Sequence, residues 1–194
     1  ALQGQTSHQR RGRRLIHLQI LGATSQVAPF FMRIAADVMG GDSGCAVIIG
    51  GLLKAIDRHD TIQTMYLVGD EDTIRPALGQ AGHLASRIEV VHSPEVLSME
   101  EKPVVGLRRK KNCSLAMATD LVKHGQADAV LSAGNTGGMV AAATIKLRTL
   151  PGVDRPGIAT VMPTKTGNFV LLDAGANVEG KPRHLMHYAI MGDV

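Results

Sequence analysis

The stretch that decides the fold is DAVLSAGNTGGMVAAATIKL, residues 128–147. Its apolar run Ala129–Leu131 predicts a strand, and its alanine-rich second half predicts a helix. Between them, Ser132–Gly138 offers small and hydrogen-bonding residues. Backbone N–H groups at a helix start, with the helix dipole behind them, form a ready anion site. The alternative is an ordinary turn with Asn135 or Thr136 as the helix cap.

The same alternation of strands and helices runs from Met32 to the end of the chain. Apolar runs predict strands at 32–37, 62–70, 87–93, 127–132, 157–162 and 168–173. Helical spacing is seen at 45–59, 71–82, 102–111, 113–125, 136–150 and 181–194. Such alternation implies right-handed crossovers and a mostly parallel, doubly wound sheet. The last helical pattern runs to the final residue without a cap, which predicts a fragment truncated at its C-terminus.

Composition excludes several classes of protein. Hydrophobic residues make up 44% of the 194 residues, aromatic residues only 3%, and Trp is absent, so the core must be aliphatic. Four arginines lie in residues 1–31, which contain no acid: Arg10, Arg11, Arg13 and Arg14. The remaining 17 basic residues balance 17 acidic ones, unlike the basic surface of a nucleic-acid binder. Residues 1–31 are therefore predicted to be a basic leader or extension, either a transit peptide or a segment preceding a start at Met32. Residues 32–194 are the predicted folded portion.

Metal, disulfide and membrane-spanning classes are also disfavoured. Cys45 and Cys113 fit no CxxC pattern, which argues against a zinc site or disulfide framework and favours a reducing compartment. His184 and His187 share a helix face but have no third ligand in view, so no metal is predicted. Neither GxxxxGK[ST] nor GxGxxG occurs, and no cofactor is predicted. No apolar run approaches the ~20 residues that span a bilayer.

Two further loops follow predicted strands, at 37–42 (DVMGGD) and 173–177 (DAGAN). Ligands of open parallel sheets bind beyond the carboxyl ends of the strands. The first loop is read either as a ligand site or as a tight turn in which Asp42 or Ser43 caps the next helix. The loop at 173–177 and the one at 132–138 either face a shared crevice or are two unrelated turns.

Taken together, several segments resemble the PlsX family of phosphate acyltransferases. They are RIAADVMGGD, LVGDEDTI, RRKKNCS, ADAVLSAGNTGG, GVDRPGIATVMPT and LLDAGANVEGKPRHLMHYAIMGDV. The resemblance covers Met32 to Val194. It implies transfer of a fatty acyl group from acyl carrier protein to inorganic phosphate in phospholipid synthesis. It also implies a three-layer α/β/α sandwich similar to phosphate acetyl- and butyryltransferases, in a cytoplasmic homodimer with peripheral membrane contact.

This reaction assigns roles to residues of the three loops and of the basic run. The expected catalytic residues are Asn135, Thr136, Asn177 and Asp173. The expected phosphate- or acyl-phosphate-binding residues are Ser132, Gly134, Gly137, Gly41, Asp42 and Asp37. The basic run is expected to attract phosphate or the acidic carrier protein, or else to be a solvated face. Its members are Arg108, Arg109, Lys110 and Lys111.

Two departures from the family pattern bear on function. Cys45 stands where the family commonly has proline, just after the first glycine turn. The family also continues well beyond Val194, with further glycine- and lysine-bearing loops and closing strands. The alternative function is therefore a truncated, non-catalytic remnant that binds phosphate or a protein partner without turnover.

Overall fold

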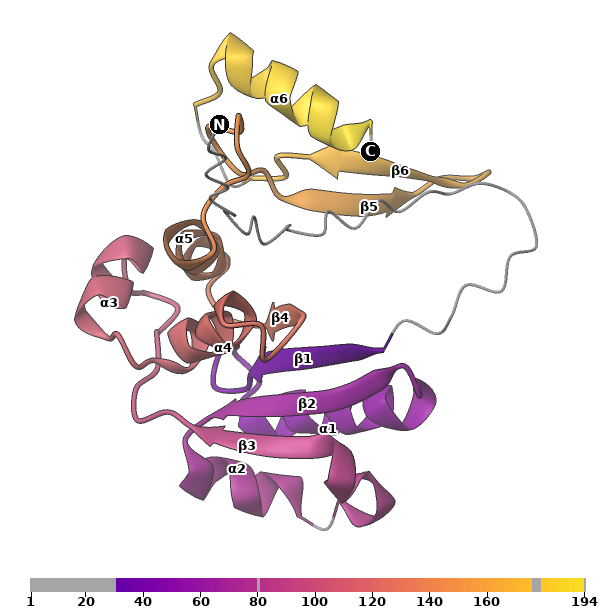
Figure 1. The fold of residues 1–194 in the computed structure, drawn as a ribbon, viewed down its shortest axis with the longest axis vertical. Helices are drawn as coiled ribbons and strands as arrows, with labels where there is room; N and C mark the ends of the chain where they lie inside the picture. Colours follow the sequence, from indigo (N-terminus) through magenta and orange to yellow (C-terminus); the bar gives the residue numbers. More distant parts are fainter. Residues whose placement is uncertain (1–30, 80, 176–178, 194) are drawn as a thin grey trace, which may run out of the picture.

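A four-stranded parallel sheet forms the centre of the computed structural model, which describes residues 31–79, 81–175 and 179–193. In the order β3-β2-β1-β4, its strands are Ile88–His92, Ile62–Gly69, Met32–Asp37 and Ala129–Ser132. One face is covered by α1 (Cys45–Arg58), α2 (Glu71–Leu78) and the 3-10 helix η1 (Gly82–Arg87), and the other by α4 (Ser114–Lys123) (Figure 1). The predicted three-layer α/β/α sandwich is confirmed.

The core is aliphatic on both faces of the sheet. Helix α1 carries Ile49, Leu52 and Ile56 at intervals of three and four residues, so all three point to the sheet. Successive strand side chains point to opposite faces, and β1 accordingly sends Ala36 towards α1 and Ala35 towards α4. The small alanines of β1 let helices approach closely from both sides.

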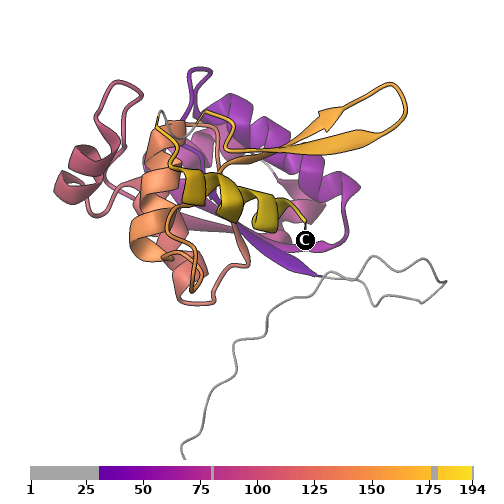
Figure 2. The ribbon, with the colours of Figure 1, turned by 90° about the horizontal axis from the view of Figure 1, so that it is seen from above.

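The prediction that 157–162 and 168–173 join the parallel sheet is wrong. Strands β5 (Ala159–Pro163) and β6 (Asn168–Leu172) pair antiparallel in a separate two-stranded sheet, and α6 (Pro182–Gly192) lies against it (Figures 1 and 2). The physical reason is the connection of only four residues between them. A hairpin needs no more, whereas a parallel crossover needs a dozen or more.

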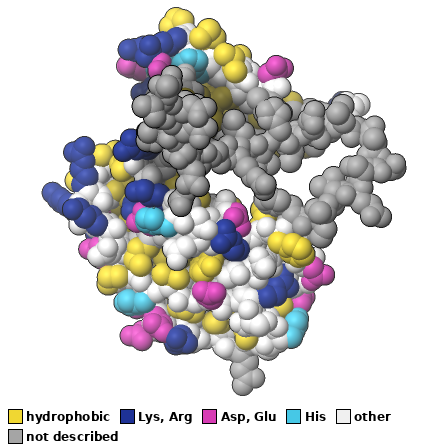
Figure 3. Space-filling model, in the orientation of Figure 1, with side chains coloured by type: hydrophobic (Ala, Val, Ile, Leu, Met, Phe, Trp, Pro, Cys, Tyr) yellow, Lys and Arg dark blue, Asp and Glu magenta, His cyan; other side chains and the backbone are white. Residues whose placement is uncertain are grey.

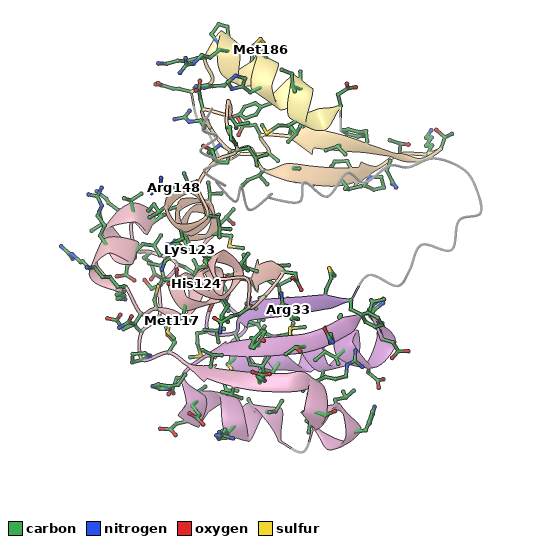
Figure 4. The ribbon with its side chains drawn as sticks, viewed as in Figure 1. Arg33, Met117, Lys123, His124, Arg148 and Met186 are labelled. Carbon is green, nitrogen blue, oxygen red and sulfur yellow. The ribbon has the colours of Figure 1, made fainter. Side chains whose placement is uncertain are left out.

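Two helices end earlier than the sequence predicts, each beside a residue with a positive φ. Helix α2 stops at Leu78, where Gly79 takes a φ of 56°. Helix α5 (Thr136–Lys146) stops before Arg148, whose φ is 68° (labelled in Figure 4). The run 102–111 is helical only over α3 (Pro103–Arg109).

The carboxyl ends of β1 and β4 lie side by side at the point where the strand order reverses. From β1 the chain passes to α1 on one face, whereas it enters β4 from α4 on the other. In doubly wound sheets this switch point is where ligands bind. The loops that follow the two strands meet there backbone to backbone. A Cβ built on Gly40 would lie 2.8 Å from the Cα of Gly134, so only glycine fits.

We expect Gly40→Ala to lower the free energy of unfolding by about 1–3 kcal/mol, because the new methyl group must push the two loops apart. Urea denaturation measures the change. The control is Gly51→Ala in α1, where an added Cβ meets nothing within 4 Å. That variant should be neutral or gain up to about 1 kcal/mol from the helix propensity of alanine. Equal stability of Gly40→Ala and the parent chain would contradict the close approach.

A bidentate ion pair holds the opposite ends of β1 and β4 together. Arg33 donates from Nη2 to Oδ1 of Asp128 (2.8 Å) and from Nε to Oδ2 (3.1 Å), and its backbone N–H also bonds Oδ2 (2.8 Å). Arg33 lies on the sheet at the start of β1 (Figure 4). The hydrogen bond from the Arg33 side chain is the main cause that lowers the pKa of Asp128.

We expect Asp128→Asn to lower stability at pH 7 and to reduce the loss of stability in acid. A carboxyl whose pKa is lowered by folding contributes stability above its unfolded pKa of about 3.9 and loses it as pH falls through the folded value. Urea midpoints measured from pH 7 to pH 2 should therefore converge for variant and parent at the acid end. Asp60→Asn, at a fully exposed carboxylate 3.9 Å from Arg87, is the control and should follow the parent. Parallel curves for Asp128→Asn and the parent would refute the role of the pair.

Candidate functional site

Asp37 ties the first two loops together. This carboxylate is only 3% exposed and ends β1. Its Oδ1 accepts from the backbone N–H groups of Met39 (3.2 Å) and Gly40 (3.3 Å), and its Oδ2 accepts from the hydroxyl of Ser132 (2.8 Å). The Ser132 oxygen in turn accepts from the N–H of Gly134 (3.1 Å). Asp37, Ser132 and Gly134, all predicted to bind substrate, are thus engaged with one another and shape the loops.

The remaining residues of the first loop are arranged differently from the prediction. Gly41 has a φ of 105°, and a Cβ there would lie 3.1 Å from the carbonyl oxygen of Ala133. Asp42 is exposed and bonds no other described residue. The prediction that Asp42 or Ser43 caps the next helix is wrong, because the N-cap of α1 is Gly44 and no side chain bonds there. Only Asp42 in this loop keeps a free carboxylate for a partner.

Asn135 is the N-cap of α5, as the alternative reading of the loop predicted. Its Oδ1 accepts from the N–H of Gly138 (2.9 Å). Its Nδ2 faces the carbonyl oxygens of the segment 98–101, the nearest being that of Met99 at 3.1 Å. Both ends of the amide are therefore engaged, and the side chain joins the segment 98–101 to the start of α5.

Thr136 and Gly137 form the first turn of α5 and open on a cavity. As the first two helical residues they have no intrahelical acceptor for their N–H groups, and the positive end of the helix dipole lies there. The cavity has a volume of about 360 Å³. It is lined by Pro103, Val104, Thr136, Gly137, Val140, Ala141, Ile158 and Gly175. The start of α5 thus offers an anion the N–H groups of Thr136 and Gly137, beside an aliphatic wall.

The third loop reaches the same cavity through Gly175. Its neighbour Ala174 donates from its N–H to the carbonyl of Ile158 (3.1 Å), which holds the loop beside the cavity wall. Asp173 has a φ of 63°, a conformation that Asp tolerates better than most residues, and hydrogen-bonds Tyr188 of α6. Burial is the main cause that raises the pKa of Tyr188, and the negative charge of Asp173 raises it further. Asn177, the other expected catalytic residue of this loop, lies outside the described residues.

The four cations of the basic run do not act alike. Lys110 donates to Glu101 Oε2 (2.7 Å) and to the carbonyl of Val96 (2.8 Å). The hydrogen bond from Lys110 is the main cause that lowers the pKa of Glu101. Arg108, Arg109 and Lys111 are exposed, and dark blue side chains project at the edge of the molecule over α3 (Figure 3). Three of the four cations are thus available to a partner, whereas Lys110 holds the loop before α3.

The other candidate groups make no site among the described residues. No group of three or more His, Cys, Asp or Glu is placed there to hold a metal ion. His184 is buried, and its Nδ1 accepts from the backbone N–H of Lys181 (3.2 Å). Cys113 is fully buried, and burial raises the pKa of its thiol and of Cys45. Within the same residues, every helix is too short or too polar to cross a bilayer.

Comparison with known proteins identifies the family of the chain. A family model described as fatty acid synthesis protein matches residues 32–194. The chain belongs to this family. Relatives named phosphate acyltransferase include those of Akkermansia muciniphila, 47% identical over 163 residues, and Desulfitobacterium hafniense, 45% identical over 163 residues. These alignments cover 84% of this chain but 47% and 48% of the relatives, so the chain spans about half of their length.

A solved structure supports the fold of this family member. The chain is similar to the EutD phosphotransacetylase from Staphylococcus aureus, with a TM-score of 0.53 and 24% sequence identity. The match covers 81% of this chain and 50% of that one. The predicted likeness to the fold of phosphate acetyltransferases is therefore confirmed at the level of the fold.

Sequence reasoning missed the apolar wall of the cavity. Pro103 and Val104 begin α3, and Ile158 precedes β5, so all three are far in sequence from the loop at 132–138. A signal was present within α5 itself. Val140 and Ala141 follow Gly137 at helical spacing, so the three share one face.

We expect Asn135→Ala to lower the free energy of unfolding by about 1 kcal/mol, the usual cost of losing a cap. Asn135→Asp is the matched variant, since aspartate still caps the helix but cannot donate to the carbonyls of 98–101. Hydrogen exchange in the segment 98–101 should rise in both variants, whereas urea denaturation should show a clear loss only in Asn135→Ala. Unchanged exchange in both would show that the amide does not anchor this segment.

Proposed function

We propose that the chain belongs to an enzyme that transfers a fatty acyl group from an acyl carrier protein thioester to inorganic phosphate. The observation that carries the proposal is the start of α5, where two N–H groups without intrahelical acceptors open on a cavity with an aliphatic wall. Phosphate suits the first feature and an acyl group the second. The names of the relatives, phosphate acyltransferase, support the same reaction.

The proposed reaction needs positioning more than covalent catalysis. An oxygen of phosphate forms a bond to the thioester carbonyl carbon, the C–S bond breaks, and the thiolate leaves with the electron pair. It takes up a proton from hydrogen phosphate, and acyl phosphate remains. Thiolate is a good leaving group, so no acyl-enzyme is required. The N–H groups of Thr136 and Gly137 offset negative charge on phosphate or on the developing oxyanion.

The residues around this turn act by holding it in place. Asp37 and Ser132 fix the neighbouring loops, and Asn135 caps α5, so these three are positioning residues in the proposal. A bare Asp37 carboxylate would repel phosphate, and its three hydrogen bonds direct it away from that role. Asp173 likewise supports the third loop through Tyr188. The expected catalytic role of Asn177 stays a prediction.

The exposed cations at the end of α3 and just after it are the proposed contact for the carrier protein. Arg108, Arg109 and Lys111 carry three positive charges, and acyl carrier protein is acidic. Helix α3 is seven residues long, about 10 Å, and its first residues line the cavity, so a carrier docked at its far end stands near the site. The family resemblance also supports a cytoplasmic homodimer with peripheral membrane contact.

The decisive test is Thr136→Pro, compared with Thr136→Val. Proline is favoured at the first position of a helix, so α5 should persist while one N–H group is lost. Asn135 has a φ of −59° and a ψ of 109°, which lies outside the right-handed helical region that a following proline disfavours. Valine removes the hydroxyl but keeps the N–H group. We expect the Kd for phosphate, measured by calorimetry, to rise at least tenfold in Thr136→Pro relative to Thr136→Val.

Turnover is measured in parallel as acyl phosphate formed from acyl carrier protein thioester and phosphate. The full-length Akkermansia muciniphila relative is the comparison enzyme. Formation of acyl phosphate by the 194-residue chain supports the enzyme. Phosphate binding without turnover supports the alternative, a remnant that binds but does not catalyse. Equal phosphate affinity of the two Thr136 variants would remove the start of α5 from the site.

A further inference from the structure

Helix α5 has two apolar stripes rather than one. Gly138 and Ala142 are buried and pack towards α4 and α3. The second stripe comprises Gly137, Val140, Ala141, Thr144 and Ile145, spaced by three and four residues and therefore on one face. Helix α5 lies between α3 and the unit formed by β5, β6 and α6 (Figure 1). Residues of the second stripe line two cavities together with Val104 of α3.

Two cavities join along this second stripe. The first, of about 360 Å³, contains Thr136 and Gly137 at its polar end. The second, of about 310 Å³, shares Val104, Val140 and Ala141 with the first and continues to Ile145 and Pro156. Eight residues separate Gly137 from Ile145, which is about 12 Å along a helix axis. The cavities therefore form one groove that starts at the proposed phosphate site.

The chemistry of the groove is aliphatic along its length. Gly137 and Ala141 are small and leave room on the floor, whereas Val104 and Ile145 stand on the walls with 44% and 54% of their surface exposed. Among the described residues, no ionisable side chain lines the first cavity. Within the same set, the charged groups that border the second cavity are Asp154 and Arg155 at its far end. An apolar groove with a hydrogen-bonding start fits a chain with one polar end.

We propose that this groove holds the fatty acyl chain, with its carbonyl at Thr136 and Gly137 and its tail running past Ala141 towards Ile145. The identity of the occupant rests on the proposed function, which supplies an acyl group whose carbonyl must lie beside phosphate. The acyl chain then has to leave that point in some direction. The groove provides an apolar path that begins there, and burial of each CH₂ group favours binding.

The test uses alkyl phosphates as probes, because they combine the phosphate and the chain without being turned over. Butyl phosphate is too short to pass Ala141, whereas hexadecyl phosphate must run the length of the groove. Titration calorimetry, below the concentration at which the longer probe forms micelles, gives both dissociation constants. In the parent chain we expect hexadecyl phosphate to bind at least tenfold more tightly than butyl phosphate.

Ala141→Phe fills the floor of the groove. We expect it to weaken hexadecyl phosphate at least tenfold and to change butyl phosphate less than twofold. Ala143→Phe is the matched control, because Ala143 lines a different cavity with Leu147 and Leu150. It should leave both probes within twofold of the parent. If Ala141→Phe fails to fold, Ile145→Ser at the exposed far wall is the second test. We expect it to weaken binding of hexadecyl phosphate severalfold and to leave binding of butyl phosphate unchanged.

Equal binding of the two probes to the parent chain would overturn the proposal. Equal losses in Ala141→Phe and Ala143→Phe would overturn it too, because the effect would then not be specific to the groove. Failure of the proposed function gives a different result from failure of the groove. If only the proposed function is wrong, no acyl phosphate forms, but probe binding still depends on chain length and on Ala141. If only the groove is wrong, acyl phosphate still forms, and Ala141→Phe does not change its dependence on chain length.

Discussion

The contact between the backbones of Gly40 and Gly134 is the constraint on which the arrangement of the site depends. It joins the loops after β1 and β4 where the strand order reverses. The buried Asp37 stabilises this contact by accepting a hydrogen bond from Ser132. Because the two loops touch, the space directly above the switch point is filled by protein. The proposed binding end lies at the next turn of chain, where Thr136 and Gly137 line the cavity. In this proposal the two glycines position the site through the contact between their loops.

The sequence predicted the sheet because its signals are local. Apolar runs with glycine turns mark β1 to β4, and helices between them force parallel pairing. Apolar runs at 157–162 and 168–173 led to the wrong sheet assignment, because the sequence of a strand does not indicate which sheet it joins. The deciding information was the short connection, four residues between β5 and β6, which allows a hairpin and forbids a crossover. Connection length, more than strand pattern, separates the two units.

The candidate site was less predictable because a residue type does not reveal its partner. Asn135 was expected to serve chemistry, yet its amide faces carbonyls of 98–101, more than thirty residues away. Lys110 looked equivalent to Arg108 in the basic run, but Glu101 and the carbonyl of Val96 engage it. These outcomes depend on how α3 packs on α5, which no local pattern encodes. The expected reaction came from the family resemblance, whereas the geometry of the loops came from the structure.

The double-sided character of α5 has a consequence for how substrate preference can change. Gly138 and Ala142 face the core, where a Cβ on Gly138 would lie 2.6 Å from Leu97. A larger side chain at Ala142 moves the helix outward and narrows the groove on its other side, since packed interiors transmit changes in volume. The width of the groove is therefore tunable from residues that no ligand touches. In the proposed function, a core substitution at Ala142 therefore changes both the stability of the protein and its preference for acyl chains, because both follow from the same displacement of α5.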